Sequence, residues 1–131
     1  MIVVDASALV AALVADAPLG AAASARLASD VDQRAPHLVD LEISSVLRRW
    51  LDQGVISADR AARALADLAA HPIERYPHVA LLPRIWELRH HVTPYDAAYI
   101  ALAEVLDAAL VTADGRLARA AGPRCTIELL T

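Results

Sequence analysis

Four acidic residues, Asp5, Glu42, Asp96 and Asp114, lie in apolar stretches of this chain. Burying a carboxylate without a partner is costly, and several carboxylates that share one site are costlier still. The chain contains no lysine, so the natural counter-charge for a gathered set of carboxylates is a divalent cation with a preference for oxygen ligands, Mg²⁺ or Mn²⁺. Such an ion activates water and holds phosphate oxygens, which points to in-line hydrolysis of a phosphodiester.

Three of these acidic residues also stand where an ordinary structural role would place them. Asp5 precedes a helical stretch and can cap it, and Asp114 can act as a turn residue or an N-cap. Asp96 lies three residues after Thr93, at the third position of a capping box. Glu42 has no such role, because it lies on the apolar face of its helix, where glutamate is rarely buried unpaired.

The predicted elements put the helix-capping positions and the candidate site at the same edge of the sheet. Asp5 and Asp114 follow short apolar strands, and Asp96 lies in the first turn of a helix. In open parallel sheets, ligands bind beyond the carboxyl ends of the strands, where the N-termini of helices favour anionic groups. We therefore expect the acidic residues to meet at one edge of the sheet.

Polar and basic residues near the aspartates add to this candidate site. The hydroxyls of Ser7 and Thr112, each two residues from an aspartate, could fix the carboxylates or hold metal-bound water, and local backbone bonding is an equal alternative. Arg116 and Arg119 are candidates to contact a substrate phosphate at the lip of this site, with a solvated helix face as the alternative. Arg48–Arg49, about two turns beyond Glu42, is expected at the surface or an interface.

Short apolar strands alternating with helical stretches predict an α/β layered fold with a mostly parallel sheet. No linker or repeat interrupts the pattern, so residues 1–131 are expected to form a single domain. The predicted strands are Ile2–Val4, Ala35–Leu38, Ile73–Tyr76, Ala109–Thr112 and Thr126–Leu130. The predicted helices are Ala6–Ala15, Leu19–Asp30, Val39–Asp52, Ser57–His71, Val79–His91, Thr93–Leu106 and Asp114–Ala121.

Composition narrows the class of protein. A net charge of −4 means that the whole-chain field does not attract nucleic acid, so binding would depend on a local basic rim or on metal. The single Cys125 rules out an internal disulfide and fits a reducing, cytoplasmic setting. The apolar stretch Ala6–Ala15 is too short to span a bilayer and has no preceding positive charges, so we expect no membrane association.

Four sequence blocks, taken in order, resemble the PIN-domain ribonucleases and, among them, the VapC-type toxins of bacterial toxin–antitoxin pairs. They are the hydrophobic strand ending in Asp5–Leu9, the helical Glu42, the block Pro94–Ala103 and the block Leu110–Ala118. The resemblance implies a three-layer α/β/α PIN-like fold and a Mg²⁺-dependent endoribonuclease, with Mn²⁺ as an alternative ion. It makes Asp5, Glu42, Asp96 and Asp114 the catalytic and metal-binding residues.

The resemblance also implies partners, namely an RNA substrate, a cognate antitoxin protein and a second copy of the chain in a homodimer. Some family members carry a further acidic residue just after the last aspartate, where this chain has Gly115 and Arg116. One permanent ion, with a second recruited by substrate, is therefore the expected arrangement.

Two other classes of function are weighed against this one. A catalytically inactive binding module of the same fold would be expected to lack one or more acidic residues, and all four are present. A phosphatase or phospho-acceptor domain would use a lysine near its aspartates, and a haloacid-type phosphatase would have a second aspartate where Ser7 stands. The sequence does not indicate which RNA is cut or which carboxylate acts as the base.

Overall fold

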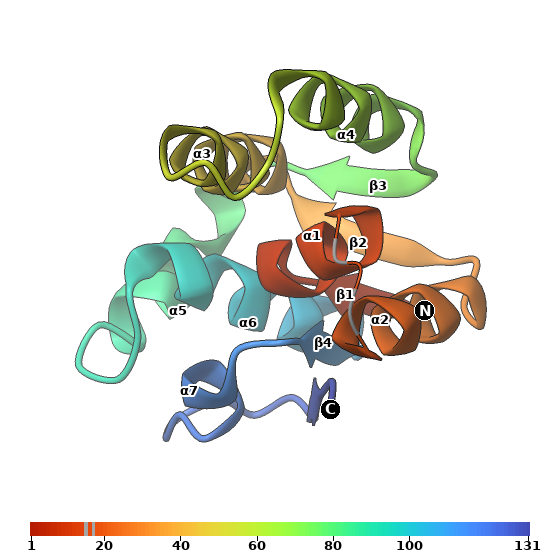
Figure 1. The fold of residues 1–131 in the computed structure, drawn as a ribbon. Helices are drawn as coiled ribbons and strands as arrows, with labels where there is room; N and C mark the ends of the chain where they lie inside the picture. The colour runs from red at the N-terminus through yellow and green to blue at the C-terminus, as the bar shows by residue number, and fades with distance from the viewer. Residues whose placement is uncertain (15, 17) are drawn as a thin grey trace.

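The central element is a five-stranded parallel sheet, seen in a computed structural model that describes residues 1–14, 16 and 18–131 (Figure 1). The strand order is β3-β2-β1-β4-β5, and every neighbouring pair is parallel. The register pairs Val4 of β1 with Val111 of β4. The strands are β1 Ile2–Val4, β2 Gln33–Pro36, β3 Ile73–Tyr76, β4 Ala109–Thr112 and β5 Ile127–Leu129.

Helices cover both faces of the sheet. From β1 the chain adds β2 and then β3 toward one edge of the sheet. It then crosses back, so that β4 lies on the other side of β1. Because such crossovers are right-handed, α1 to α4 lie on one face and α5 and α6 on the other. The helices are α1 Ala6–Val14, α2 Pro18–Ala28, α3 Leu38–Asp52, α4 Ala58–Ala70, α5 Leu82–Glu87, α6 Pro94–Leu106 and α7 Gly115–Ala118.

The core explains why the strands are apolar throughout. Val3 and Val4 of β1 and Leu110 and Val111 of β4 are fully buried, as expected for strands covered on both faces. Strand order reverses at β1, so the carboxyl ends of β1 and β4 form the edge where ligands bind in folds of this kind. The predicted three-layer α/β/α fold with a parallel sheet is confirmed.

Two predicted elements were misplaced. The second strand begins at Gln33, two residues before the predicted Ala35, because its polar side chains find partners. The amide of Gln33 donates to the carbonyls of Leu27 and Asp30 at 2.7 and 3.0 Å. Sequence patterning penalises polar residues in a strand, and it could not foresee these hydrogen bonds.

The predicted helix Val79–His91 is wrong in its form and its end. A single 3₁₀ turn, η1 Val79–Leu81, leads into α5, which ends at Glu87. Pro83 in the first turn lacks an N–H, which favours a new helix start at this point. His90 and His91 therefore lie in the turn between α5 and α6, and not at a helix C-terminus.

The remaining elements agree with the predictions to within a few residues. The predicted helix over Asp114–Ala121 is shorter, since α7 ends at Ala118, and β5 begins at Ile127. Ala15, at the end of the first predicted helix, lies outside the described residues. Within the described part of the chain, no single helix has the length and apolar composition to cross a membrane, although α1 and α2 pass that test as a bent pair.

Candidate acidic metal site

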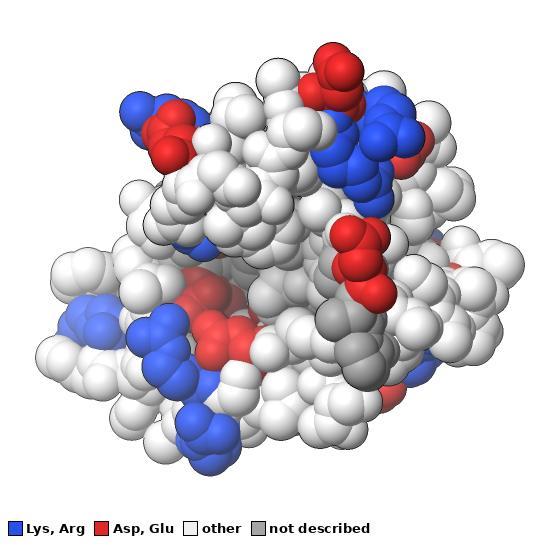
Figure 2. Space-filling model, in the orientation of Figure 1, with Lys and Arg blue, Asp and Glu red and all other residues white. Residues whose placement is uncertain are grey.

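All four acidic residues line one hollow of about 270 Å³ at the carboxyl edge of the sheet. Asp5 follows β1, Asp114 follows β4, Asp96 is in the first turn of α6, and Glu42 comes from α3. In the space-filling view, acidic atoms lie in a recess with basic atoms beside it (Figure 2). The fold thus gathers residues that are up to 109 positions apart in sequence, as the strand-end argument predicted.

Asp5 is the most rigidly held carboxylate of the four. The Ser7 hydroxyl donates to its Oδ1 at 2.7 Å, and the Thr112 hydroxyl donates to its Oδ2 at 2.6 Å. The Ala8 N–H also donates to Oδ1, at 3.0 Å, which makes Asp5 the predicted cap of α1. Burial raises the pKa of Asp5 above the ordinary aspartate value, although these three donors oppose the rise.

Ser7 and Thr112 link the two strand ends as well as fixing Asp5. The Ser7 hydroxyl accepts from the Ala113 N–H at 2.9 Å, and the Thr112 hydroxyl accepts from the Asp114 N–H at 3.0 Å. Each hydroxyl has one proton and uses it in the hydrogen bond that it donates to Asp5. The two hydroxyl oxygens lie 3.2 Å apart, but no proton remains for a hydrogen bond between them. Of the alternatives raised by the sequence, the structure shows two together: both hydroxyls fix the Asp5 carboxylate, and Thr112 also bonds to the local backbone at Asp114.

Glu42 is the acidic residue with the least protein support. Its Oε1 is buried and has no hydrogen-bond partner in the described part of the chain, and the same is true of the buried Tyr99 hydroxyl. Burial raises the pKa of Glu42, the neighbouring Tyr99 hydroxyl opposes the rise, and the charges of Asp96 and Asp5 add to it. Native proteins rarely leave a buried carboxylate oxygen without a partner, so this atom needs an explanation.

Asp96 and Asp114 combine capping geometry with a place in the hollow. The Thr93 hydroxyl accepts from the Asp96 N–H at 3.2 Å, and Asp114 Oδ1 accepts from the Arg116 N–H at 2.9 Å. The predicted N-caps Thr93 and Asp114 are confirmed, whereas the Asp96 side chain does not return to the Thr93 N–H as a full capping box would require. Burial and then the charge of Asp114 raise the pKa of Asp96. Because backbone capping uses only one oxygen of Asp114 and none of Asp96, both side chains keep oxygens directed to the site.

A divalent cation fits these donors by chemistry. The hollow offers hard carboxylate oxygens, one of them buried without a partner among the described residues. Burial, and to a lesser degree the neighbouring carboxylates, raises the pKa of Asp5, Glu42 and Asp96. Across residues 1–14, 16 and 18–131, no three of the acidic, histidine or cysteine side chains are gathered tightly enough to chelate an ion together. This arrangement suits Mg²⁺, which keeps several waters in its shell and takes few direct protein ligands.

The structure adds three residues whose place in the site sequence reasoning missed. Arg49 is exposed, as expected, but it lines the acidic hollow together with Ser45. Both follow Glu42 at helical spacings of three and seven residues, which would have placed them on its face. Tyr99 lines the hollow three residues after Asp96 for the same reason. The helical spacing of these residues from Glu42 and Asp96 was enough to predict that they face the site.

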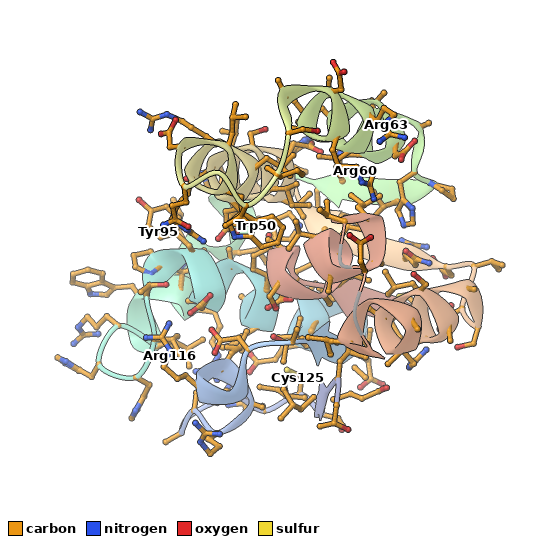
Figure 3. All side chains as sticks on the ribbon, in the orientation of Figure 1. Trp50, Arg60, Arg63, Tyr95, Arg116 and Cys125 are labelled. Atoms are coloured by element: carbon orange, nitrogen blue, oxygen red, sulfur yellow. The ribbon has the colours of Figure 1, made fainter. Side chains whose placement is uncertain are left out.

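The two candidate arginines of α7 differ in position. Arg116 is exposed, and its Nη2 lies 3.8 Å from Asp114 Oδ2 at the mouth of the site (Figure 3). Arg119 lines none of the hollows described here, and its guanidinium folds toward Gly115, where a Cβ would meet Nη1 at 2.9 Å. The structure therefore brings Arg116 to the site and leaves the role of Arg119 a prediction.

Comparisons with known proteins agree with this fold. A family model for the PIN domain matches residues 2–123. The crystal structure of VapC20 from Mycobacterium tuberculosis, a sarcin–ricin loop cleaving toxin, superposes with a TM-score of 0.70 at 20% identity over 90% of this chain and 93% of that one. PAE2754 from Pyrobaculum aerophilum superposes with a TM-score of 0.68 at 26% identity, over 96% and 81%. The chain belongs to the PIN domain family.

Sequence relatives narrow the class further. The chain is 44% identical to ribonuclease VapC9 of Mycobacterium tuberculosis over 130 residues, which cover 99% of this chain and 98% of the relative. It is 45% identical to ribonuclease VapC1 of the same species over 125 residues, covering 92% and 94%. Within the PIN family, these matches place the chain with the VapC-type ribonucleases, as its four sequence blocks predicted.

Proposed function

We propose that this protein is a Mg²⁺-dependent endoribonuclease that acts as the toxin of a type II toxin–antitoxin pair. The observation that carries the proposal is the acidic hollow, in which Asp5 is locked in place and Glu42 Oε1 is buried without a partner. A site of this kind is incomplete as protein alone. The ribonuclease names of relatives at 44% and 45% identity support RNA as the substrate.

The residues of the chain divide the work of hydrolysis. Asp5, Glu42, Asp96 and Asp114 would hold Mg²⁺, or Mn²⁺ in its place, and the ion supplies charge stabilisation at the scissile phosphate and a more acidic water. Ser7 and Thr112 keep Asp5 in one orientation, so that its oxygens need no reorganisation when substrate binds. A carboxylate of the hollow would orient or deprotonate the attacking water for in-line displacement at phosphorus.

The rival functions are less well supported. An inactive binding module would have no reason to retain a carboxylate held by three donors beside a second whose buried Oε1 has no partner among the described residues. A phosphatase of the kind considered above would use a lysine, and the sequence has none. The nuclease proposal accounts for both observations.

We also propose a cytoplasmic setting, a homodimer and a cognate antitoxin as the partner that restrains the enzyme. These rest on the VapC relationship and on the single Cys125, which is half-buried and unpaired among the described residues. With Gly115 and Arg116 after the last aspartate, we propose one permanent ion per chain, with a second recruited by substrate.

The direct test is RNA cleavage by the purified chain freed of antitoxin. We expect cleavage with Mg²⁺ or Mn²⁺, none with EDTA, and a loss on the order of 100-fold or more for Asp5→Asn and Asp96→Asn. Asp67→Asn, at an exposed position of α4, is the matched control and should cleave like wild type. Cleavage that survives EDTA, or an Asp96→Asn variant as fast as Asp67→Asn, would refute the assignment.

A further inference from the structure

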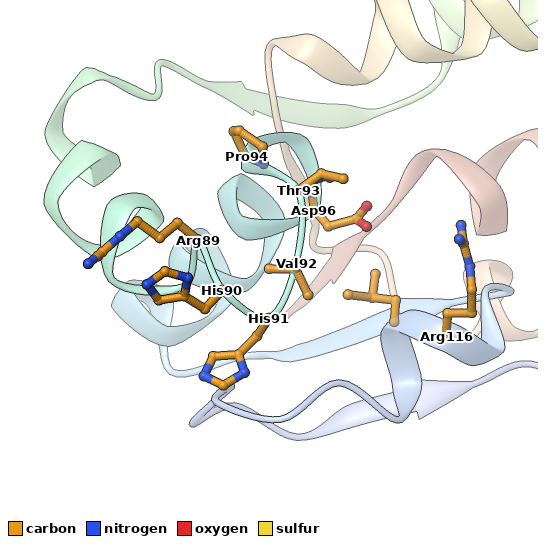
Figure 4. Close-up of a pocket in the computed structure, with 9 residues that line it drawn as sticks. Arg89, His90, His91, Val92, Thr93, Pro94, Asp96 and Arg116 are labelled. Carbon is orange, nitrogen blue, oxygen red and sulfur yellow. Dashed lines mark hydrogen bonds between the residues drawn. The ribbon is translucent and has the colours of Figure 1, made fainter.

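A second hollow adjoins the acidic one and extends it into a path. The groove has a volume of about 540 Å³ and lies between the turn that joins α5 to α6, residues 89–94, and α7 (Figure 4). Asp96 lines both the groove and the acidic hollow, so the two are continuous at that residue. A chain whose scissile bond lies at the carboxylates can therefore continue into this groove.

Two exposed arginines line the two hollows, one in each. Arg49 comes from α3 and lines the acidic hollow, and Arg116 comes from α7 and lines the groove. Arg49 makes no ion pair and no side-chain hydrogen bond with the described residues, and Arg116 has only the 3.8 Å contact to Asp114. An exposed guanidinium with no partner, or with only one long contact, keeps donors available to an anionic ligand.

Several other arginines of the molecule are already engaged, and those without a partner among the described residues, such as Arg48, Arg63 and Arg119, line neither the acidic hollow nor the groove. Arg26, Arg34, Arg75 and Arg84 each hold a carboxylate at 2.6 to 2.8 Å. The Arg89 guanidinium lies over the Trp86 ring at 4.8 Å, and Figure 4 shows it turned away from Asp96. The net charge of −4 gives no general attraction for a polyanion, so these local cations matter more.

The groove itself is lined by surfaces that suit a nucleobase. Val92, Pro94 and Leu117 supply apolar contact, and the rings of His90 and His91 lie along the turn. Bases of single-stranded RNA stack on apolar, aromatic and imidazole surfaces, whereas paired bases are hidden inside a duplex. The lining therefore favours an unpaired nucleotide.

We propose that single-stranded RNA crosses the site with one flanking phosphate on Arg49 and another on Arg116, and that the nucleotide beyond Arg116 lies in the groove of residues 89–94. The proposal rests on the proposed ribonuclease function and adds the path of the substrate. It assigns specificity to the turn between α5 and α6, because that turn contacts the base next to the scissile bond.

The test measures binding separately from cleavage. A short unstructured RNA labelled with fluorescein is titrated with protein in Mg²⁺ and slightly alkaline buffer, with all changes made in a Glu42→Gln background. Fluorescence anisotropy gives Kd over a range of KCl concentrations. Each phosphate contact with a single strand contributes about 0.7 to the slope of log K against log salt.

We expect Arg49→Ala and Arg116→Ala each to weaken binding on the order of threefold to tenfold and to reduce the slope by about 0.7. Arg48→Ala, next to Arg49 on α3, and Arg63→Ala, exposed on α4 and distant from Arg116 in Figure 3, are the controls and should leave the slope unchanged. The double variant His90→Ala/His91→Ala should weaken binding without changing the slope, while the control His78→Ala does neither.

The outcomes separate this inference from the proposed function. If the wild-type chain cleaves RNA but Arg49→Ala and Arg116→Ala keep the slopes of their controls, the path is wrong and the function stands. An unchanged Kd for the histidine variant also overturns the path, and so does the absence of RNA binding. If the arginine and histidine variants behave as expected but the wild-type chain cuts no RNA, the path stands and the function fails.

Discussion

Two glutamates on helices, Glu104 and Glu42, show what the molecule does with a structural and with a functional carboxylate. Glu104 on α6 is held by Arg84 at 2.8 and 3.0 Å and by the Arg124 N–H at 2.7 Å. Burial alone would raise the pKa of Glu104, but these donors hold it below the ordinary value. Glu42 on α3 has a buried oxygen without a partner and a raised pKa.

The difference shows that the fold is able to pair a carboxylate with an arginine but does not do so at Glu42. Arginine–carboxylate pairs occur elsewhere in the molecule. Arg75 lies 2.7 Å from Asp40, which is two residues before Glu42 on α3. Arg49 lines the same hollow as Glu42 yet is not paired with it. We interpret the Glu42 carboxylate, which has no arginine partner among the described residues, as part of a site kept open for a cation, at a cost in stability that function requires.

The largest expected effect separates the two glutamates by activity. Glu42→Gln should lower RNA cleavage on the order of 100-fold or more, because it removes a charged oxygen ligand. Glu104→Gln should leave kcat/KM per folded molecule unchanged, because Glu104 does not line the acidic hollow. Cleavage assays on both variants decide this, and equal losses would remove the distinction drawn here.

The free energy of unfolding should rank these two variants in the opposite order, with Glu104→Gln the more strongly affected. Glu104→Gln breaks charged hydrogen bonds of a carboxylate that is 13% exposed, so unfolding free energy should fall by about 1.5–3 kcal/mol. Glu42→Gln removes an unpaired buried charge, so the metal-free protein should unfold at the same or a higher denaturant midpoint than wild type. Urea titration in EDTA measures both, and a strongly destabilised Glu42→Gln variant would contradict our interpretation.

The dependence of stability on pH sharpens the contrast further. Asp5, Glu42 and Asp96 have raised pKa values when folded, so their stabilising contribution is complete at acid pH, below the unfolded values. That contribution is lost as pH rises through the raised folded values, because the native state then has to give up protons.

Mg²⁺ competes with those protons, so the increase in Tm that it produces should grow with pH over the same range. The readout is the difference in Tm between protein with Mg²⁺ and protein without it. Carboxyls with a lowered pKa, such as Glu104, change Tm with pH in the opposite direction, but they do so equally in both samples and cancel in the difference. A difference that is flat with pH, or that shrinks as pH rises, would count against a metal site built from these three carboxyls.

The smallest expected effect concerns Tyr99. Its hydroxyl opposes the rise in the pKa of Glu42, so Tyr99→Phe should weaken Mg²⁺ binding by roughly tenfold. The stability of the metal-free protein should change little, because the Tyr99 hydroxyl lies near Glu42 but makes no close hydrogen bond among the described residues. Unaltered Mg²⁺ affinity would show that Tyr99 only fills space.

Sequence patterns predicted most of the fold and the members of the acidic site. Apolar strands that end in Asp5 and near Asp114 fixed the edge at which the carboxylates meet, because parallel strands share their direction. The start of β2 at Gln33 was missed, because its polar side chain is satisfied by carbonyls that only the folded chain supplies.

The surroundings of the acidic residues were harder to predict than their identity. That both oxygens of Asp5 are bonded while an oxygen of Glu42 is not depends on side-chain geometry across α3, α6 and the strand ends. The groove could not be predicted while Val79–His91 was expected to be one helix, because it is the turn after α5 that lines the groove with His90 and His91.

The most direct test of the central claim is calorimetric titration of metal-free protein with Mn²⁺, comparing wild type, Glu42→Gln and Glu104→Gln. We predict one tightly bound ion per wild-type chain, the same binding in Glu104→Gln, and a loss of that binding in Glu42→Gln. If wild type binds no ion, or if Glu42→Gln binds Mn²⁺ as tightly as wild type, the acidic edge is not a metal site built around Glu42.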